Sequence, residues 1–219
     1  MQQTDYSLIF RFLRQLALHN DRQWFQDNKA QYLQAQEAAA ALIQSCIASL
    51  SAQFPLDNPD ARQCMFRIYR DVRFSANKNP YKTSFSALLA PGGRKSASVF
   101  SWYLHLEPDN CFLASGIYEP SPAQLAAIRQ EIAWNAPAFR EILAPLEKDF
   151  GALLGDPLKT APKGYSREHP EIDFLRLTRF YFMKSYPEKS LSDPDFPLRF
   201  SGDCMQLLPF LQFLHTATS

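Results

Sequence analysis

The sequence predicts an α+β domain, in which an antiparallel sheet of about five strands is flanked by helices at the N-terminus, in the middle and at the C-terminus. Three observations lead to this prediction. Apolar residues recur with a helical period over residues 5–54, the period changes to two over residues 64–117, and helical spacing returns over residues 121–150. Short turns rather than helices join the predicted strands, so the pattern does not indicate a parallel βαβ sheet.

The N-terminal region predicts a helical hairpin. Apolar residues at helical spacing predict a first helix over residues 5–18. Asn20, with Gln23 three residues later, has the pattern of a helix cap and predicts a second, longer helix that continues to Phe54. The sequence ProLeuAspAsnProAsp at residues 55–60 then predicts a loop, because its two prolines cannot continue either a helix or a central strand.

The predicted sheet begins at Cys64. From this residue apolar and polar side chains alternate, which predicts a first strand whose outer face carries Arg67. Residues 84–90 and 98–106 alternate in the same way and are joined by a ProGlyGlyArgLys turn, so they predict a hairpin. A further turn leads to a fourth predicted strand at residues 111–115.

The C-terminal half predicts helices and one more strand. Ser121 and Gln124, with a proline between them, have the pattern of a capping box and predict the start of a helical region that an AsnAlaPro sequence divides in two. A polar connection over residues 155–173 follows. The last strand and a C-terminal helix are predicted within residues 174–216, from an aromatic-rich run and a final leucine pattern.

The composition allows one large domain or two small ones, of which we favour one, and it argues against several functional classes. The chain has 219 residues, of which 46% are hydrophobic, which is enough for a single large core. Its 23 basic and 22 acidic residues nearly cancel, so we do not expect the positive field of a duplex-binding protein. The four cysteines form no CxxC pair, and we interpret them as reduced core thiols rather than as metal ligands. No cofactor and no metal is predicted.

The same features predict a cytoplasmic protein with no membrane contact. The N-terminal sequence MQQTDYSLIF lacks a basic start followed by an apolar run, as a signal peptide would have. No stretch approaches about 18 uninterrupted apolar residues, which a membrane-spanning helix needs. The pattern favours no particular oligomeric state.

A basic cluster is the main indication of function. The stretch from Arg67 to Thr83 contains a single acid, Asp71, and five cations: Arg67, Arg70, Arg73, Lys78 and Lys82. Such cations repel one another unless an anion lies among them, so the stretch predicts an anion site, to which Tyr81 would add a ring and a hydroxyl. We expect Asp71 to orient one arginine rather than to act as a base. In the alternative interpretation, Arg70 or Arg73 pairs with Asp57 or Asp60 and the cluster is purely structural.

Four motifs in the chain resemble those of the domain of unknown function 2461 family. They are RDVRFSANKNPYKT, GIYEP, IRQEI and KGYSREHP. The resemblance extends over about residues 7 to 215. It implies a soluble, bacterial-type, single-domain protein of α+β build, and it brings no established activity. Asn77 stands where the family usually has an acid, and Ser115 where it usually has a glycine, so we expect any contribution of that acid to be weaker here.

A second polar segment is expected to lie near the first. Lys163, Tyr165 and His169 belong to the polar connection and are predicted to fold over the basic cluster as a lid, with Tyr118 and Arg129 close by. A lone histidine between acidic residues is more often a surface or capping residue than a general acid, so we do not interpret His169 as catalytic.

The residues favour an anion-binding pocket for a phosphate- or carboxylate-bearing ligand. No nucleophile with a partner base can be named, so whether the protein is an enzyme stays open, and any catalysis would be electrostatic stabilisation by fixed cations. The alternative from another class is a module that binds single-stranded nucleic acid or an acidic protein. Salt separates the two, because several phosphate contacts make affinity fall steeply with salt.

Overall fold

The computed structural model of the chain describes residues 5–57 and 60–219. The chain divides into two compact units, and each unit is assembled from separate stretches of sequence. Unit 1 comprises the described residues of Met1–Ser96 together with Tyr103–Leu113 and Ser185–Asp203, and unit 2 comprises Ala97–Trp102, Ala114–Lys184 and Cys204–Ser219. The assignment of the whole chain to a single domain stays a prediction. Of the sequence-based expectations above, those for the N-terminal residues 1–4 and for Asn58 and Pro59 lie outside the described residues.

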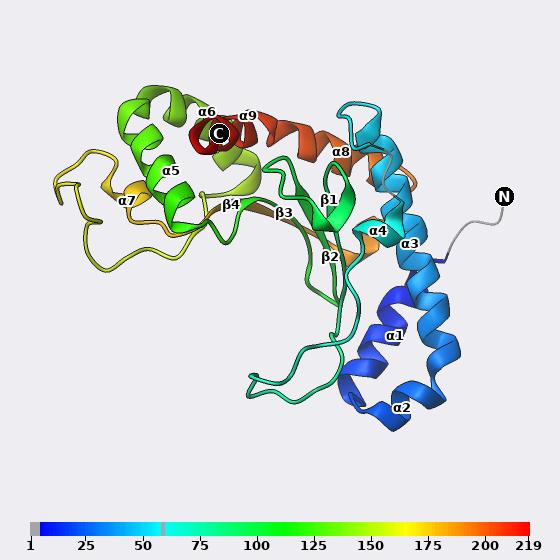
Figure 1. Cartoon of the computed structure of the whole chain (residues 1–219). Coiled ribbons are helices and arrows are strands. Elements are labelled where there is room, and N and C mark those ends of the chain that lie inside the picture. Colours follow the sequence, from blue (N-terminus) through cyan, green and yellow to red (C-terminus); the bar gives the residue numbers. More distant parts are fainter. Residues whose placement is uncertain (1–4, 58–59) are drawn as a thin grey trace. The chain divides into compact units, whose positions relative to one another are not determined.

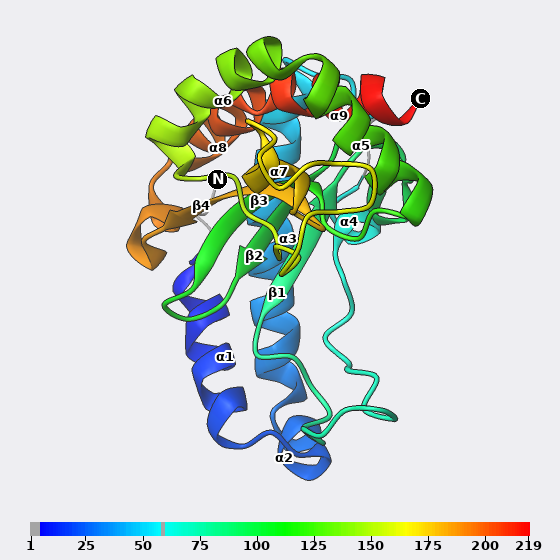
Figure 2. The ribbon, with the colours of Figure 1, turned by 90° about the vertical axis from the view of Figure 1, so that its left-hand side faces the viewer.

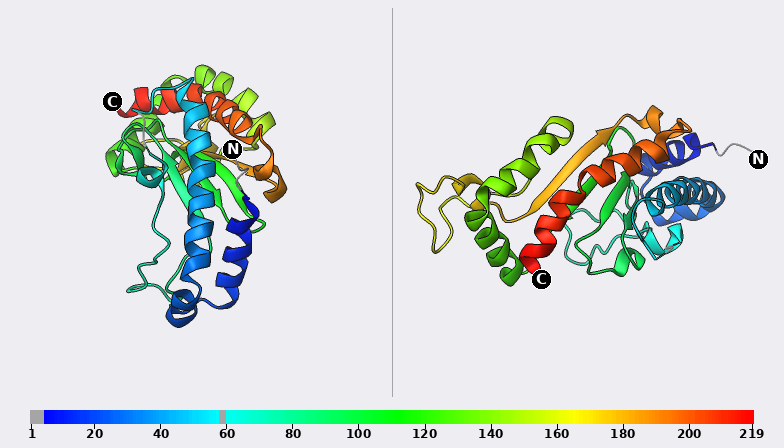
Figure 3. Two further views of the ribbon diagram at one scale, coloured as in Figure 1. Left: turned by 90° about the vertical axis from the view of Figure 1, so that its right-hand side faces the viewer. Right: turned by 90° about the horizontal axis from the view of Figure 1, so that it is seen from above.

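Unit 1 begins with three helices, α1 (Ser7–Leu18), α2 (Arg22–Asp27) and α3 (Lys29–Ser51). The first predicted helix is confirmed, and α1 packs along α3 (Figures 1 and 3). The prediction of one long second helix capped by Asn20 was wrong. Asp21 caps α2 by accepting a hydrogen bond from the Trp24 backbone, and a break at Asn28 separates α2 from α3. Asn20 is not available as a cap, because its side chain holds the backbone of Tyr81.

The strand predicted from Cys64 onward does not form. Cys64 ends a short helix, α4 (Ala61–Cys64), which Asp60 caps. Beyond it the chain makes only isolated antiparallel bridges, from Met65 to Ala87 and from Tyr69 to Tyr81. The alternation of side chains is real, but a strand also needs a continuous partner, and here the two bridges lie too far apart to form a ladder.

Within the described residues, four strands rather than about five form one antiparallel sheet in the order β1-β2-β3-β4. They are β1 (Phe85–Leu89), β2 (Trp102–Leu106), β3 (Cys111–Ile117) and β4 (Phe180–Tyr186). The predicted hairpin and the predicted last strand are thus confirmed. The alternation in β2 has the expected consequence, because Trp102, Leu104 and Leu106 are fully buried while Tyr103 and His105 are only partly so.

The short helix η1 (Gly93–Lys95) lies in the connection between β1 and β2. Gly92 precedes it with a positive φ of 79°, a backbone conformation that favours glycine. The connection belongs to unit 1 as far as Ser96.

Unit 2 contains the helices predicted after the third strand. The capping box of Ser121 and Gln124 begins α5 (Pro122–Trp134), and α6 (Ala136–Phe150) follows after one residue, as predicted. Helix α7 (Ile172–Leu175) ends the polar connection, and α9 (Leu208–Thr218) confirms the C-terminal helix. Helices α5 and α9 lie side by side (Figure 3).

Two elements before α9 were not predicted. They are the 3-10 helix η2 (Glu188–Ser192) and helix α8 (Phe196–Gln206). Proline and glycine are typical of turns, so Pro197 and Gly202 made this stretch resemble a turn in the sequence. Pro197 lies in the first turn of α8, however, where a missing backbone N–H costs little.

Half of the aromatic side chains, 15 of 30, are buried. Trp102 and Phe25 are buried, whereas Trp134 is 72% exposed. All four cysteines are buried, and burial raises the pKa of the Cys64 and Cys111 thiols to about 11. Among residues 5–57 and 60–219, no helix combines the length and apolar character that crossing a membrane requires.

Candidate functional site

The basic segment forms a loop between α4 and β1 whose two ends are tied together (Figure 2). Lys82 donates its backbone N–H to Ile68 O over 2.8 Å, and Arg70 donates to Pro80 O over 2.9 Å. These two bonds flank the bridge between Tyr69 and Tyr81. The loop therefore leaves and returns at one place in unit 1, which brings Arg70 near Lys82 although they are twelve positions apart in sequence.

Tyr81 anchors the returning end of this loop. Its ring stacks on Phe25 with the ring centroids 4.0 Å apart, and the side chain is 3% exposed. Asn20 binds the Tyr81 backbone on both sides, because Asn20 Nδ2 donates to the carbonyl oxygen over 3.0 Å and Oδ1 accepts from the N–H over 3.1 Å. Tyr81 lines the pocket described below, and a direct contact with a ligand stays a prediction.

Two of the five predicted cations have local partners. Arg73 forms a two-pronged ion pair with Asp71, with Nη2 to Oδ2 at 2.7 Å and Nε to Oδ1 at 3.0 Å. Asp71 thus binds an arginine, and its part in a ligand site stays a prediction. The alternative partner Asp60 instead caps α4. Lys78 donates from Nζ to the carbonyl of Val72 over 3.1 Å.

The remaining three cations line two different pockets of unit 1. Arg67 lines one pocket together with Arg62 and Arg94. Arg70 and Lys82 line the other. Arg70 donates from Nη2 to Ser75 Oγ over 3.3 Å, and the Lys82 ammonium lies over the ring of Phe66 at 5.4 Å. In the described part of the chain, no carboxylate lies within 4.0 Å of the charged group of Arg70 or Lys82.

We call the cavity at Arg70 and Lys82 the polar pocket. It has a volume of about 260 Å³, and all its lining residues belong to unit 1. Side chains that donate or accept hydrogen bonds make up the lining: Asn20, Arg70, Asn77, Asn79, Tyr81, Lys82, Thr83, Ser84, His105 and Glu107. Asn77 of the basic segment is therefore part of this pocket.

One wall of the polar pocket is a hydrogen-bonded chain that the sequence analysis missed. His105 Nδ1 lies 3.0 Å from the Tyr103 hydroxyl, and His105 Nε2 lies 3.2 Å from Glu107 Oε2. Glu107 also accepts from Thr83 Oγ1 over 2.6 Å and from Asn110 Nδ2 over 3.0 Å. The alternation of β2 placed Tyr103 and His105 on one face and was the signal available in the sequence.

His105 and Glu107 in this wall both have lowered pKa values. Burial lowers the pKa of His105, and the nearby Lys82 acts in the same direction, while the bond to Glu107 opposes them. Burial tends to raise the pKa of Glu107, but hydrogen bonds from Thr83, Asn110 and His105 bring it below its ordinary value. His105 is therefore neutral and Glu107 charged near neutral pH.

Acid is expected to destabilise the protein through this wall. Both pKa values are lower in the folded state, so the unfolded chain binds more protons, and stability falls as the pH drops below about 6.5 for His105 and about 4.3 for Glu107. Urea unfolding from about pH 7.5 to about pH 4.5 measures this slope. We expect His105→Gln to flatten the upper part of the curve and the exposed control His19→Gln to retain it. Equal slopes in both variants would contradict the assignment.

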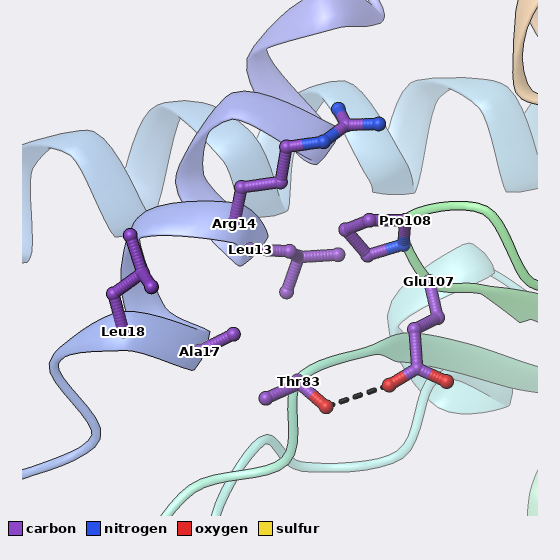
Figure 4. Close-up of a pocket in the computed structure, with 7 residues that line it drawn as sticks. All are labelled: Leu13, Arg14, Ala17, Leu18, Thr83, Glu107 and Pro108. Carbon is purple, nitrogen blue, oxygen red and sulfur yellow. Dashed lines mark hydrogen bonds between the residues drawn. The ribbon is translucent and has the colours of Figure 1, made fainter.

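An apolar pocket adjoins the polar pocket. Its volume is about 400 Å³, and α1 contributes Leu13, Ala17 and Leu18 to its lining. Figure 4 shows Thr83 and Glu107 on the opposite side, joined by their hydrogen bond. These two residues line both pockets. The charge of Arg14 at its rim is compensated by Glu188, with Nη2 to Oε2 at 2.7 Å.

The second predicted segment belongs to unit 2. Arg129 donates from Nε to Leu175 O over 2.7 Å and from Nη2 to Leu177 O over 3.2 Å, and burial lowers its pKa. These bonds satisfy carbonyls at the end of α7, so they give Arg129 a structural role. The contribution of Arg129 to a ligand site stays a prediction.

The other predicted residues of this segment also have partners within unit 2 or are exposed. His169 accepts the backbone N–H of Glu171 at Nδ1 over 3.0 Å, which fits the interpretation of a capping residue. Tyr165 contacts the His169 ring, the Arg179 guanidinium lies 4.1 Å from the Tyr118 ring centroid, and Lys163 is exposed. A lid formed by this segment over the basic cluster stays a prediction. Within the described ranges, no group of three or more His, Cys, Asp or Glu side chains is placed to hold a metal ion.

Comparison with known proteins identifies a family but no characterised relative. The model of one family, described as "Conserved hypothetical protein (DUF2461)", matches residues 8–213, which is nearly the whole chain. No curated protein and no solved structure gives a significant match. The match includes the loop of Arg70 and Lys82, the polar pocket and the KGYSREHP segment. The chain therefore belongs to the DUF2461 family of conserved hypothetical proteins.

Proposed function

We propose that the protein binds a small anionic ligand, bearing a phosphate or a carboxylate, in the polar pocket. One observation carries the proposal. Arg70 and Lys82 line the same polar cavity, and neither has a carboxylate within 4.0 Å among the described residues. Two neighbouring cations without a counter-ion attract an anion, and the arginine fork suits phosphate and carboxylate oxygens equally.

The state of Lys82 supports this proposal. Burial lowers the pKa of Lys82, and repulsion from Arg67 lowers it further. Lys82 is therefore harder to protonate in the folded protein than in water. An anion bound beside the ammonium reverses both effects and raises the pKa, so binding is linked to keeping Lys82 protonated.

The carboxylate of Glu107 does not neutralise these cations. It accepts hydrogen bonds from Thr83, Asn110 and His105, and it lies more than 4.0 Å from the Lys82 and Arg70 charges. A ligand that presents an anionic group to Arg70 and Lys82 and a hydroxyl to Glu107 would match both ends of the pocket. Any catalysis there would rest on stabilising negative charge with the two cations, because both nitrogens of His105 are already engaged.

A thermal-shift panel tests the proposal. The purified protein is screened against inorganic phosphate, nucleotides, sugar phosphates, dicarboxylates and short single-stranded DNA. A ligand present at 100 times its dissociation constant should stabilise the fold by about 2.7 kcal/mol. We expect one class of small anions to do so, with the shift lost in Arg70→Gln and kept in Arg73→Gln, whose guanidinium pairs with Asp71 instead of lining the polar pocket.

A second function, binding of single-stranded nucleic acid, is favoured by one observation. Phe74 is 98% exposed in the middle of the basic loop, beside Arg73, and Tyr69 is 50% exposed nearby in sequence. Exposed aromatic rings among cations offer stacking platforms for bases. If DNA alone stabilises the protein, if affinity falls steeply with salt, and if Phe74→Ala weakens binding, this function replaces the small-anion pocket.

A further inference from the structure

A third cavity in unit 1 is lined by three arginines. Its volume is about 550 Å³, and it lies between α3, α4 and the η1 turn. Arg62 comes from α4, Arg67 from the following stretch, and Arg94 from η1. Leu33, Ala40, Met65 and Phe66 supply the apolar part of the lining, and Gln36 and Glu37 complete it.

The backbone around it holds Arg94 in place. Its Nη1 donates to Met65 O over 2.9 Å and approaches the carbonyl oxygens of Arg62 and Gln63 at 3.3 Å. These carbonyls lie at the end of α4, where helical partners are lacking. Nη1 is thereby engaged, whereas Nε and Nη2 donate no hydrogen bond to the described residues. These bonds thus fix the guanidinium and leave the N–H groups of Nε and Nη2 able to donate to a ligand.

The charges of this cavity do not cancel. Arg62 pairs with Glu37, with Nη2 to Oε2 at 3.1 Å, and both side chains are largely exposed. In the described part of the chain, neither Arg67 nor Arg94 has a carboxylate within 4.0 Å. Two positive charges therefore remain at the cavity, which matches the charge of one phosphoryl dianion.

We propose that this cavity, which we call the arginine pocket, is a second ligand site that binds the phosphate group of a phosphomonoester. Arg67 and Arg94 bind the phosphoryl oxygens, and the organic part of the ligand lies on Leu33 and Phe66. Leu33 is 51% exposed, so a ligand there covers an apolar side chain that the fold leaves in water. The residues that line this cavity differ from those of the polar pocket, which Arg70 and Lys82 line.

Calorimetric titration of phenyl phosphate and of inorganic phosphate tests the arginine pocket. The titrations use the Arg70→Gln variant, so that the polar pocket does not contribute. Removing one cation that binds a phosphoryl oxygen should weaken binding at least about tenfold, which we expect for Arg67→Gln. Phenyl phosphate should bind more tightly than phosphate, and Leu33→Ser should remove that difference.

Glu37 provides a variant that must strengthen binding. Its carboxylate lies at the cavity and repels an anion, so Glu37→Gln should raise phosphate affinity several-fold. The fold should stay intact, because Glu37 pairs only with an exposed arginine. Arg11→Gln, an exposed position on α1 outside the cavity, removes one positive charge and is therefore the charge-matched control for Arg67→Gln. The proposal is overturned if neither anion binds, or if Arg67→Gln and Glu37→Gln change affinity no more than Arg11→Gln does.

Discussion

Replacing Gly116 with alanine is expected to destabilise unit 2 more than any surface change, by over about 4 kcal/mol. Gly116 in β3 has a φ of +136°, a backbone conformation that residues with a side chain rarely adopt. An added Cβ would collide with the carbonyl oxygen of Phe180 and lie 2.7 Å from Tyr181 Cα. These are backbone atoms of β4, the adjacent strand, so relief requires the strands to separate.

Gly202 in α8 is the matched control for this substitution. A Cβ added there meets nothing within 4 Å, and the backbone is helical. Gly202→Ala should therefore stabilise the fold by about 0.5–1 kcal/mol, because alanine loses less conformational freedom in a helix. Denaturant unfolding measures both variants. A Gly116→Ala protein that unfolds within about 1 kcal/mol of the wild type would contradict the close approach of β3 and β4.

Replacing Trp102 with alanine is the second large effect. The ring is fully buried, and its Nε1 donates to the carbonyl of Cys204 over 2.9 Å, both within unit 2. Truncation leaves a cavity and removes this bond, which should lower the free energy of unfolding by about 3–5 kcal/mol. Trp134→Ala is the control, because this ring is 72% exposed and its loss should change stability by less than about 0.5 kcal/mol.

The comparison of these two tryptophans measures burial directly. Both variants remove the same side chain, so they differ only in its surroundings. Similar losses of stability, read from denaturant unfolding curves, would show that Trp102 is not a core residue.

Local signals predicted much of the fold. The capping box at Ser121 needs only residues three positions apart, and the alternation of β2 needs only its own strand, so both are legible in the sequence. The stretch after Cys64 shows the limit of this approach. Its alternation matched a strand, but the pairing that makes a strand is non-local, and only two isolated bridges form.

The site was predicted in part for the same reason. Arg70 and Lys82 line one pocket because the loop closes on itself at Tyr69 and Tyr81, and their binding of an anion stays a prediction. Hydrogen bonds of the loop itself hold Arg73 and Lys78, and composition does not reveal such bonds. Two residues of the arginine pocket, Arg62 and Arg94, lie outside the basic stretch. They line the same cavity only because α4 and η1 contact each other.

The wall of His105 and Glu107 was missed because these residues lie outside the basic motif. The alternation of the strand did place Tyr103 and His105 on one face, and Glu107 follows at the same spacing. His105 and Glu107 line the polar pocket because β2 lies beside the residues that precede β1. No local sequence pattern predicts this arrangement.

The most direct measurement of the central claim is calorimetric titration of the stabilising anion into wild-type protein, Lys82→Met and Lys78→Met. Methionine keeps an apolar stem against Phe66 and removes the charge from the polar pocket, while Lys78 only donates to a loop carbonyl. We predict that Lys82→Met weakens binding at least about tenfold and that Lys78→Met changes it less than about threefold. Equal affinities in all three proteins would show that the anion does not bind in the polar pocket.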